Sequence, residues 1–178
     1  PDIIMVGEIR DLETAEIAVR AALTGHLVLS TLHTNDAPAV VTRLADMGIP
    51  HFLIAASLAG CIAQRLVRKV CPECAETYRA TPQEKEILEV APEAPLALRR
   101  GRGCPWCLNT GYRGRTGIFE ILTVTEVVRR AIDRRVSADD LRELARREGM
   151  VDLFAHGREK VLAGETTLAE LLRVTRGQ

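Results

Sequence analysis

The first eleven residues, P-D-I-I-M-V-G-E-I-R-D, most constrain what this chain can fold into. Ile3–Val6 is a short, continuous apolar run that Gly7 and Glu8 close. Such a run predicts a strand buried on both faces, as in a parallel sheet. Glu8 would then stand at the carboxyl end of this strand, where open α/β sheets bind ligands. An ordinary charged loop after a buried strand is the alternative, so a functional role for Glu8 depends on the other motifs of the chain.

The residues after this strand predict a repeated strand-and-helix pattern. Asp11 can cap a helix over Leu12–Leu23, and His26–Thr31 has the low charge of a second strand. Asn35 or Asp36 can then cap a further helix. The order strand, helix, strand, helix indicates a parallel α/β fold.

Further elements are predicted beyond residue 50, and the cysteine-containing stretch begins at residue 71. The pattern predicts, in order, an apolar segment over 51–58, a strand over 61–70, a short helix over Pro82–Val90, a linker around 91–98, a Gly-rich turn returning into a strand over 111–121, and helices over 125–133, 138–147, 151–162 and 166–174.

Composition places the chain among globular proteins. Apolar residues make up 47% and charged residues 27% of its 178 residues. Lys+Arg and Asp+Glu both number 24, so overall charge predicts neither a polyanionic nor a membrane partner. No apolar run approaches the roughly 18–20 residues that span a bilayer. We expect a cytoplasmic protein, and the absence of an initial Met indicates a piece of a longer one.

The five cysteines include two C-x-x-C pairs, and these are the most specific local signal. Cys71 and Cys74 form the first pair, and Cys104 and Cys107 form the second. Four thiolates suit tetrahedral zinc and leave no open coordination position, so the sequence predicts a structural zinc site. A redox pair or an iron–sulfur cluster is the alternative. Cys61 has no partner in its apolar run and is expected to be a buried small hydrophobe.

The segment from 94 to 119 is strongly basic. It holds five arginines and no acidic residue, with one tryptophan and one tyrosine among them: Arg99, Arg100, Arg102, Arg113, Arg115, Trp106 and Tyr112. Such a segment beside a zinc knuckle can bind nucleic acid or phosphate. The favoured interpretation is a solvated, basic protein–protein face, because the aromatic residues are too sparse for base stacking.

Two histidines bracket the second predicted strand. If that strand neighbours the first, His33 emerges at the same sheet edge as Glu8, beside several hydroxyl and amide side chains. A lone histidine is more often structural, but this polar cluster exceeds what a simple core needs. The sequence contains no G-x-x-x-x-G-K-[ST], so any phosphate-binding loop is expected upstream of Pro1.

Together these motifs resemble the secretion ATPase superfamily, the motors of type IV pilus assembly and type II secretion. The matching stretches are P-D-I-I-M-V-G-E-I-R-D, similar to the Walker B motif; T-G-H-L-V-L-S-T-L-H-T-N-D-A, similar to the histidine box; Q-R-L-V-R-K-V-C-P-E-C with the tetracysteine element; G-R-T-G-I-F-E; and G-R-E-K-V-L-A-G-E-T-T near the end. The tetracysteine favours the pilus-extension and type II secretion branch over the retraction ATPases.

The resemblance implies an α/β fold, the C-terminal half of a RecA-like P-loop NTPase core with a parallel sheet. An inserted tetracysteine zinc subdomain and a C-terminal helical subdomain complete it. Residues 1–70 would form the core half with the Walker B motif and histidine box. Residues 71–115 would form the zinc subdomain, and 116–178 the C-terminal strand and helices.

The resemblance also implies roles for single residues. Glu8 would be the catalytic carboxylate, and His26 and His33 would belong to the histidine box near the γ-phosphate and the subunit interface. Arg65 and Arg10 would lie near the nucleotide or an adjoining subunit. His156 departs from the pattern, since the family often has Asp there.

The function implied is that of a hexameric motor that hydrolyses ATP with Mg²⁺ and also holds structural Zn²⁺. It would act in the cytoplasm, peripheral to the inner membrane, against a platform protein of the pilus or secretion machine and without nucleic acid. A zinc-dependent nucleic-acid-binding domain is the alternative. Salt-sensitive binding of DNA or RNA would favour that alternative.

Overall fold

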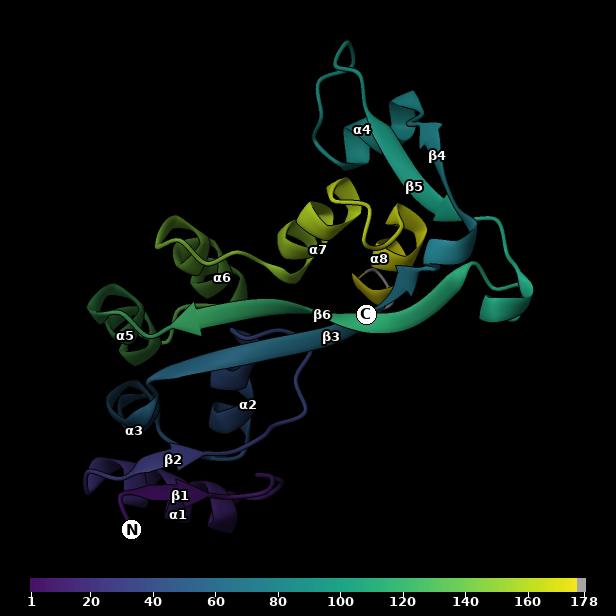
Figure 1. Cartoon of the computed structure of the whole chain (residues 1–178). Coiled ribbons are helices and arrows are strands. Elements are labelled where there is room, and N and C mark those ends of the chain that lie inside the picture. Colours follow the sequence, from purple (N-terminus) through teal and green to yellow (C-terminus); the bar gives the residue numbers. More distant parts are fainter. Residues whose placement is uncertain (176–178) are drawn as a thin grey trace. The chain divides into compact units, whose positions relative to one another are not determined.

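The chain divides into two compact units, each built from two stretches of sequence. The computed structural model describes residues 1–175, so 176–178, the end of the expected C-terminal subdomain, lie outside the described range. The first unit comprises Pro1–Ala63 and Glu120–Val151. The second comprises Gln64–Phe119 and the residues from Asp152 onward. Figure 1 shows the elements in chain order.

The first unit begins with a strand, a helix and a second strand. Strands β1 (Ile3–Met5) and β2 (Leu27–Leu29) pair in parallel, and helix α1 (Leu12–Leu23) connects them. The helix begins where the sequence predicts, because Asp11 accepts a 2.8 Å hydrogen bond from the backbone N–H of Thr14. The predicted mixed α/β fold is confirmed, with parallel pairing shown between these two strands.

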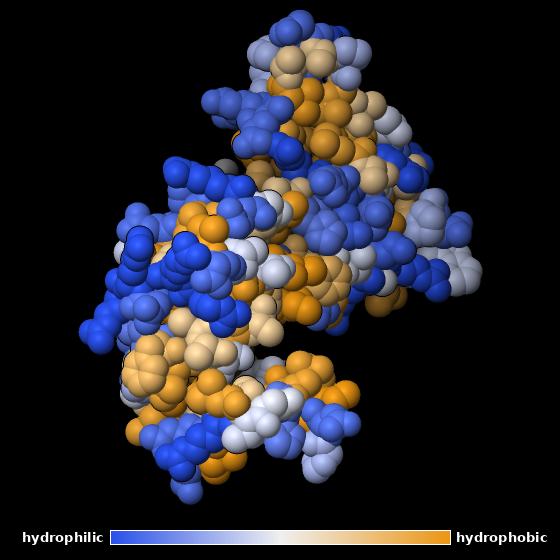
Figure 2. Space-filling model, turned by 90° about the vertical axis from the view of Figure 1, so that its left-hand side faces the viewer, coloured by the Kyte–Doolittle hydropathy of each residue, from blue (hydrophilic) through white to orange (hydrophobic). Residues whose placement is uncertain are grey.

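The prediction that the first strand is buried on both faces is wrong within the described residues. Ile3 and Met5 are 60% and 79% exposed, and Leu27 and Leu29 are each 51% exposed. Alternate strand residues share a face, so these four side chains form one exposed apolar face of the β1–β2 pair. Among residues 1–175 the sheet that contains β1 has two strands, β1 and β2, and α1 packs against it. Figure 2 shows hydrophobic surface at the lower end of the view, where Figure 1 places β1 and β2.

The remaining helices of the first unit form its core. They are α2 (Ala39–Asp46), α3 (His51–Ser57), α5 (Glu126–Asp133) and α6 (Ala138–Arg147). The apolar segment 51–58 thus forms a helix, and α3 packs on α1, α2 and α5. Fully buried side chains from these helices and the adjoining strand fill the interior: Ile54, Leu122, Val128, Ile132 and Leu141. Burial of this apolar area is what stabilises such short helices.

Two long strands pair with each other and contribute to both units. They are β3 (Gly60–Val70) and β6 (Tyr112–Thr123). Within the first unit the two strand backbones lie so close together that a Cβ on Gly60 would lie 2.9 Å from the carbonyl oxygen of Leu122. Glycine is therefore required at the start of β3.

The second unit surrounds the cysteine pairs with short elements. They are η1 (Pro72–Cys74), β4 (Ala75–Arg79), α4 (Pro82–Ile87), β5 (Ala97–Gly101), η2 (Pro105–Cys107), α7 (Leu153–Leu162) and α8 (Leu168–Thr175). β4 and β5 are antiparallel. The prediction of a linker over 91–98 is wrong at its C-terminal end, because strand β5 begins at Ala97. Glu76 lies opposite Arg100 in this pair, with 2.8 Å between carboxylate and guanidinium, which stabilises two polar strands.

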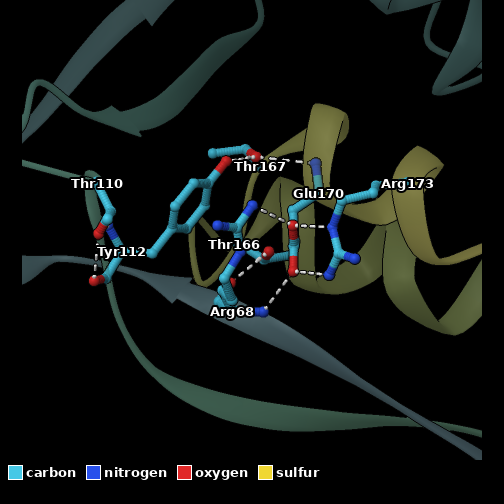
Figure 3. A network of polar contacts seen from close by, with 7 residues as sticks. All are labelled: Arg68, Thr110, Tyr112, Thr166, Thr167, Glu170 and Arg173. Atoms are coloured by element: carbon cyan, nitrogen blue, oxygen red, sulfur yellow. Dashed lines mark hydrogen bonds and ion pairs between the residues drawn. The ribbon is translucent and has the colours of Figure 1, made fainter.

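A buried carboxylate organises the end of the second unit. The side chain of Glu170 is fully buried and accepts hydrogen bonds of 2.7–3.0 Å from the Arg68 backbone and guanidinium and from the Arg173 guanidinium. Arg68 lies 4.1 Å from the ring centroid of Tyr112, whose hydroxyl is 2.8 Å from the hydroxyl of Thr167. Figure 3 shows how this network joins β3, β6 and α8. We expect it to stabilise the second unit.

Glu170→Gln should lower the free energy of unfolding near neutral pH by about 3 kcal/mol. Burial raises the pKa of Glu170, but hydrogen bonds from Arg173 and Arg68 outweigh it and lower the pKa from 4.5 to about 2. Because the folded-state pKa is below the unfolded one, this stabilisation is present above about pH 4.5 and is lost as pH falls toward about 2.

Urea unfolding of wild type and variant between pH 7 and pH 3 measures this difference. The two curves should converge as pH falls. The exposed Glu165, which pairs with Lys160 at 3.2 Å, gives the matched control Glu165→Gln, with an expected change of less than about 0.5 kcal/mol. A pH-independent difference would show that the charge of Glu170 is not the stabilising feature.

Candidate active site and metal centre

The loops that follow β1 and β2 are hydrogen-bonded to each other. The Ile9 N–H donates to the Thr31 carbonyl at 3.0 Å, and the Thr31 hydroxyl donates to the Gly7 carbonyl at 2.8 Å. Because the two strands are parallel, both loops leave the same edge of the pair. This places the residues after β1 beside those after β2.

Glu8 lies at this edge between two basic side chains. One carboxylate oxygen is 2.6 Å from Nη2 of Arg10, and the other is 2.7 Å from Nε2 of His33. The Glu8 side chain is 21% exposed, whereas those of Arg10 and His33 are 76% and 88% exposed. The sequence expectation that His33 emerges beside Glu8 therefore agrees with the geometry.

A cleft of about 310 Å³ opens at this group. Its lining residues are Glu8, Ile9, Arg10, His33 and Arg43. Arg43 comes from α2 and sequence reasoning missed it, because an arginine within a helix carries no motif of its own. The cleft therefore combines one carboxylate with three basic side chains, an arrangement suited to an anionic ligand and a positioned water molecule.

The electrostatic surroundings of Glu8 favour its ionised form. The hydrogen bond from Arg10 lowers its pKa most, burial opposes this, and the charges of Arg10 and His33 lower it further. An ionised carboxylate only accepts hydrogen bonds, so Glu8 can orient a water molecule or take a proton from it.

Two of the other sequence candidates have different surroundings in the structure. His26 stands before β2, and its Nδ1 is 3.1 Å from the Ala21 carbonyl and 3.2 Å from the Thr24 hydroxyl at the end of α1. Arg65 belongs to the second unit, where its Nη1 donates to the Gln64 carbonyl at 3.2 Å. Their predicted roles stay predictions.

The four paired cysteines converge in the second unit. Their sulfur atoms all lie within 4.8 Å of one another: Cys71, Cys74, Cys104 and Cys107. Three of the separations are 3.9 Å for Cys71–Cys104, 3.9 Å for Cys74–Cys107 and 3.7 Å for Cys104–Cys107. A tetrahedron with metal–sulfur bonds of about 2.3 Å has edges of about 3.8 Å. The donor set therefore fits one tetrahedral metal ion.

The backbone around Cys107 supports negative charge on its sulfur. Cys107 Sγ accepts N–H hydrogen bonds of 3.2 Å from Cys104 and Gly111. Burial raises the pKa of the Cys107 thiol, but these hydrogen bonds outweigh it and lower the pKa to about 6. Thiolate is the form that binds metal. Gly111 also lets the backbone pass close to Gly101, where a Cβ would lie 2.1 Å from the Gly111 carbonyl oxygen.

The basic segment between 94 and 119 is partly neutralised by contacts that cross strands. Arg100 and Arg102 lie 2.8 and 3.4 Å from the carboxylate of Glu76, an acid outside the segment. The Arg113 guanidinium stacks 4.5 Å from the ring centroid of Trp106, which is 66% exposed. The interpretation of this segment as a basic protein–protein face stays a prediction. Among residues 1–175, no helix combines the length and the apolar character needed to cross a membrane.

Comparison with known proteins agrees with the sequence resemblance. A model of the family described as "Type II/IV secretion system protein" matches residues 1–173. The chain is 54% identical over 176 residues to type II secretion system protein E of Pseudomonas aeruginosa, covering 99% of this chain and 35% of that protein. It is 50% identical over 178 residues to the type IV pilus assembly ATPase PilB of Thermus thermophilus, covering 98% of this chain and 20% of that protein.

A solved structure shows the same fold. The ATPase DotB of Legionella pneumophila superposes with a TM-score of 0.67 at 24% identity, covering 100% of this chain and 39% of DotB. The chain spans about a third of the length of the type II secretion relatives that it matches. Since the family model extends over nearly all of the sequence, the chain belongs to the type II/IV secretion system protein family.

Proposed function

We propose that this chain is the C-terminal part of a motor ATPase that powers type II secretion or type IV pilus assembly. The observation that carries the proposal is Glu8, a carboxylate at the carboxyl end of a parallel strand, 2.7 Å from the ring of His33. Relatives that the chain matches almost throughout are named as ATPases of these two systems. Fold and site chemistry thus point to the same reaction.

In this proposal Glu8 orients or activates the water that attacks the γ-phosphate of ATP. His33 lies beside that phosphate, and bound Mg²⁺ supplies charge stabilisation there. The phosphate-binding loop belongs to another part of the ATPase, whose core also covers the exposed β1–β2 face. Arg10 and Arg65 act at the nucleotide or an adjoining subunit, and His26 acts through the histidine box at the subunit interface.

The four cysteines hold one structural Zn²⁺. The whole ATPase is a hexamer, cytoplasmic and peripheral at the inner membrane, which works against an inner-membrane platform protein without nucleic acid. Functionally, residues 1–70 serve as the ATPase-core half, 71–115 as the zinc subdomain, and the remainder as the C-terminal strand and helical subdomain. The distances between the sulfur atoms support the metal assignment, and the match to secretion relatives supports the assignment to such an ATPase.

Comparing the 178-residue chain with the whole ATPase tests the proposed function. The whole protein should hydrolyse ATP in the presence of Mg²⁺, whereas the 178-residue chain should show negligible turnover. Glu8 and His33 form only part of a site, and the triphosphate has little to hold it without phosphate-binding amides and a lysine. Calorimetry on the short chain provides the second measurement. Tight stoichiometric ATP binding there, or a whole protein without ATPase activity, would contradict the proposal.

A further inference from the structure

The loop that carries His33 is held by side chains from distant parts of the sequence. This histidine loop comprises residues 30–38, between β2 and α2. The Ala37 N–H donates a buried 2.8 Å hydrogen bond to Oε1 of Glu120 on β6. Glu120 and Ala37 are 3% and 1% exposed. A buried carboxylate that accepts a backbone hydrogen bond fixes that backbone strongly, since losing the acceptor leaves an unsatisfied N–H.

A second contact fixes the preceding residue. Asp36 accepts a 2.8 Å hydrogen bond from the Ala39 N–H with one oxygen, which anchors the start of α2. Its other oxygen accepts a 2.8 Å hydrogen bond from Nη2 of Arg142 on α6. Both side chains of this ion pair are mostly buried, at 21% and 29% exposed. Two elements far along the sequence therefore hold consecutive residues of one loop.

The opposite end of the loop is tied to the loop of Glu8. Thr31 is hydrogen-bonded to both Gly7 and Ile9, the two neighbours of Glu8 in the chain. His33 lies between Thr31 and Asp36, and its 88% exposed side chain makes the 2.7 Å contact with Glu8. Because that ring is held so little by packing, its position depends on the backbone that the two ends of the loop define.

We propose that Glu120 and Arg142 are positioning residues that set the place of His33 relative to Glu8. Neither side chain lines the cleft that contains those two residues. They act through the histidine loop, Glu120 on the Ala37 N–H and Arg142 on the Asp36 carboxylate. The inference rests on the proposed ATPase function for its kinetic consequence, whereas its geometric consequence is independent of that function.

In the whole ATPase, Glu120→Ala should lower kcat at least ~10-fold with KM for ATP changed less than about threefold, because small misplacements of reacting groups are costly. Glu120→Gln keeps an acceptor oxygen for the Ala37 N–H and should recover most of the rate. Arg142→Met should also lower kcat. The control Arg147→Met removes an exposed ion pair with Glu143 on the same helix and should leave kcat unchanged.

Combination with His33→Ala separates positioning from general destabilisation. If Glu120 acts through His33, Glu120→Ala should lower kcat no further in the His33→Ala background. Additive losses would overturn the inference, as would normal turnover in both Glu120→Ala and Arg142→Met. Thermal melting is recorded for each protein, and Arg142→Met carries the test if Glu120→Ala does not fold.

A measurement without ATP distinguishes failure of this inference from failure of the proposed function. In the 178-residue chain, the imidazole Cε1–H resonance of His33 is identified by its loss in His33→Gln. It should shift in Arg142→Met and in Glu120→Ala, return toward wild type in Glu120→Gln, and stay unchanged in Arg147→Met. An unchanged resonance in Arg142→Met and Glu120→Ala would overturn the inference even if the whole protein hydrolyses ATP. The predicted shifts would support the inference even if the whole protein does not hydrolyse ATP.

Discussion

Glu8→Gln in the whole ATPase should lower kcat at least ~10²-fold, the lower range for a positioned acid–base group, while ATP affinity stays near wild type. The amide keeps the shape and reach of the carboxylate but loses the charge and basicity that orient or activate water. ATP binding should be spared, because the proposed function assigns the phosphate-binding loop to another part of the whole ATPase. Steady-state hydrolysis and equilibrium binding of ATP measure the two effects.

The structure supplies a matched control for this substitution. Glu16 forms an exposed ion pair of 3.2 Å with Arg20 on α1, and neither residue lines the cleft. Glu16→Gln should therefore leave both kcat and ATP affinity unchanged. If Glu8 were structural, Glu8→Gln would instead lower the melting temperature and weaken turnover and binding together. Asp11 would be the next carboxylate to test, although it caps α1 in this structure.

Removal of metal should have the largest effect on the stability of the second unit. Protein purified without added metal should contain one zinc per chain, bound by Cys71, Cys74, Cys104 and Cys107. Structural zinc contributes on the order of 10 kcal/mol in small modules. Chelation should therefore lower the melting temperature strongly. Elemental analysis and melting with and without chelator measure this.

Two single-cysteine variants make this test specific. Cys107→Ser should abolish stoichiometric zinc, because it removes one of four ligands. Cys61→Ala should keep one zinc per chain, since Cys61 is a buried thiol whose pKa is raised to about 12 by burial and is not one of the four cysteines that form the metal-fitting group. A metal-free protein that melts unchanged with chelator would contradict the structural-zinc assignment. Iron and acid-labile sulfide in place of zinc would indicate a cluster.

Local patterns explain what could be predicted from the sequence. Asp11 and the apolar spacing after it predict α1, because a cap and a periodic face are both encoded within a few residues. Spacing alone also predicts the cysteine group, since two C-x-x-C turns bring four thiolates together. Glu8 and His33 could be matched because parallel strands end at one edge.

Contacts between distant residues explain what could not be predicted. The hydrogen bond from Ala37 to Glu120 joins residues 83 apart in sequence, and no local pattern encodes it. β5 lacks the alternating apolar residues that would predict a strand. It pairs with β4, where Arg100 lies opposite Glu76, and this contact is seen only in the folded structure. The exposure of β1 could not be predicted either, because the apolar run that begins at Ile3 predicts a strand but not how many other elements cover that strand.

Single-turnover hydrolysis beside equilibrium nucleotide binding, on one preparation of the Glu8→Gln ATPase, tests the central claim most directly. The Glu8 carboxylate lies 2.7 Å from the His33 ring in the cleft, and its surroundings favour the ionised form. We therefore expect replacement of this carboxylate by an amide to slow the chemical step. We predict that hydrolysis of prebound ATP slows at least ~10²-fold while the binding isotherm matches wild type. Hydrolysis at the wild-type rate in a fully loaded variant would contradict the assignment of Glu8 as the catalytic carboxylate.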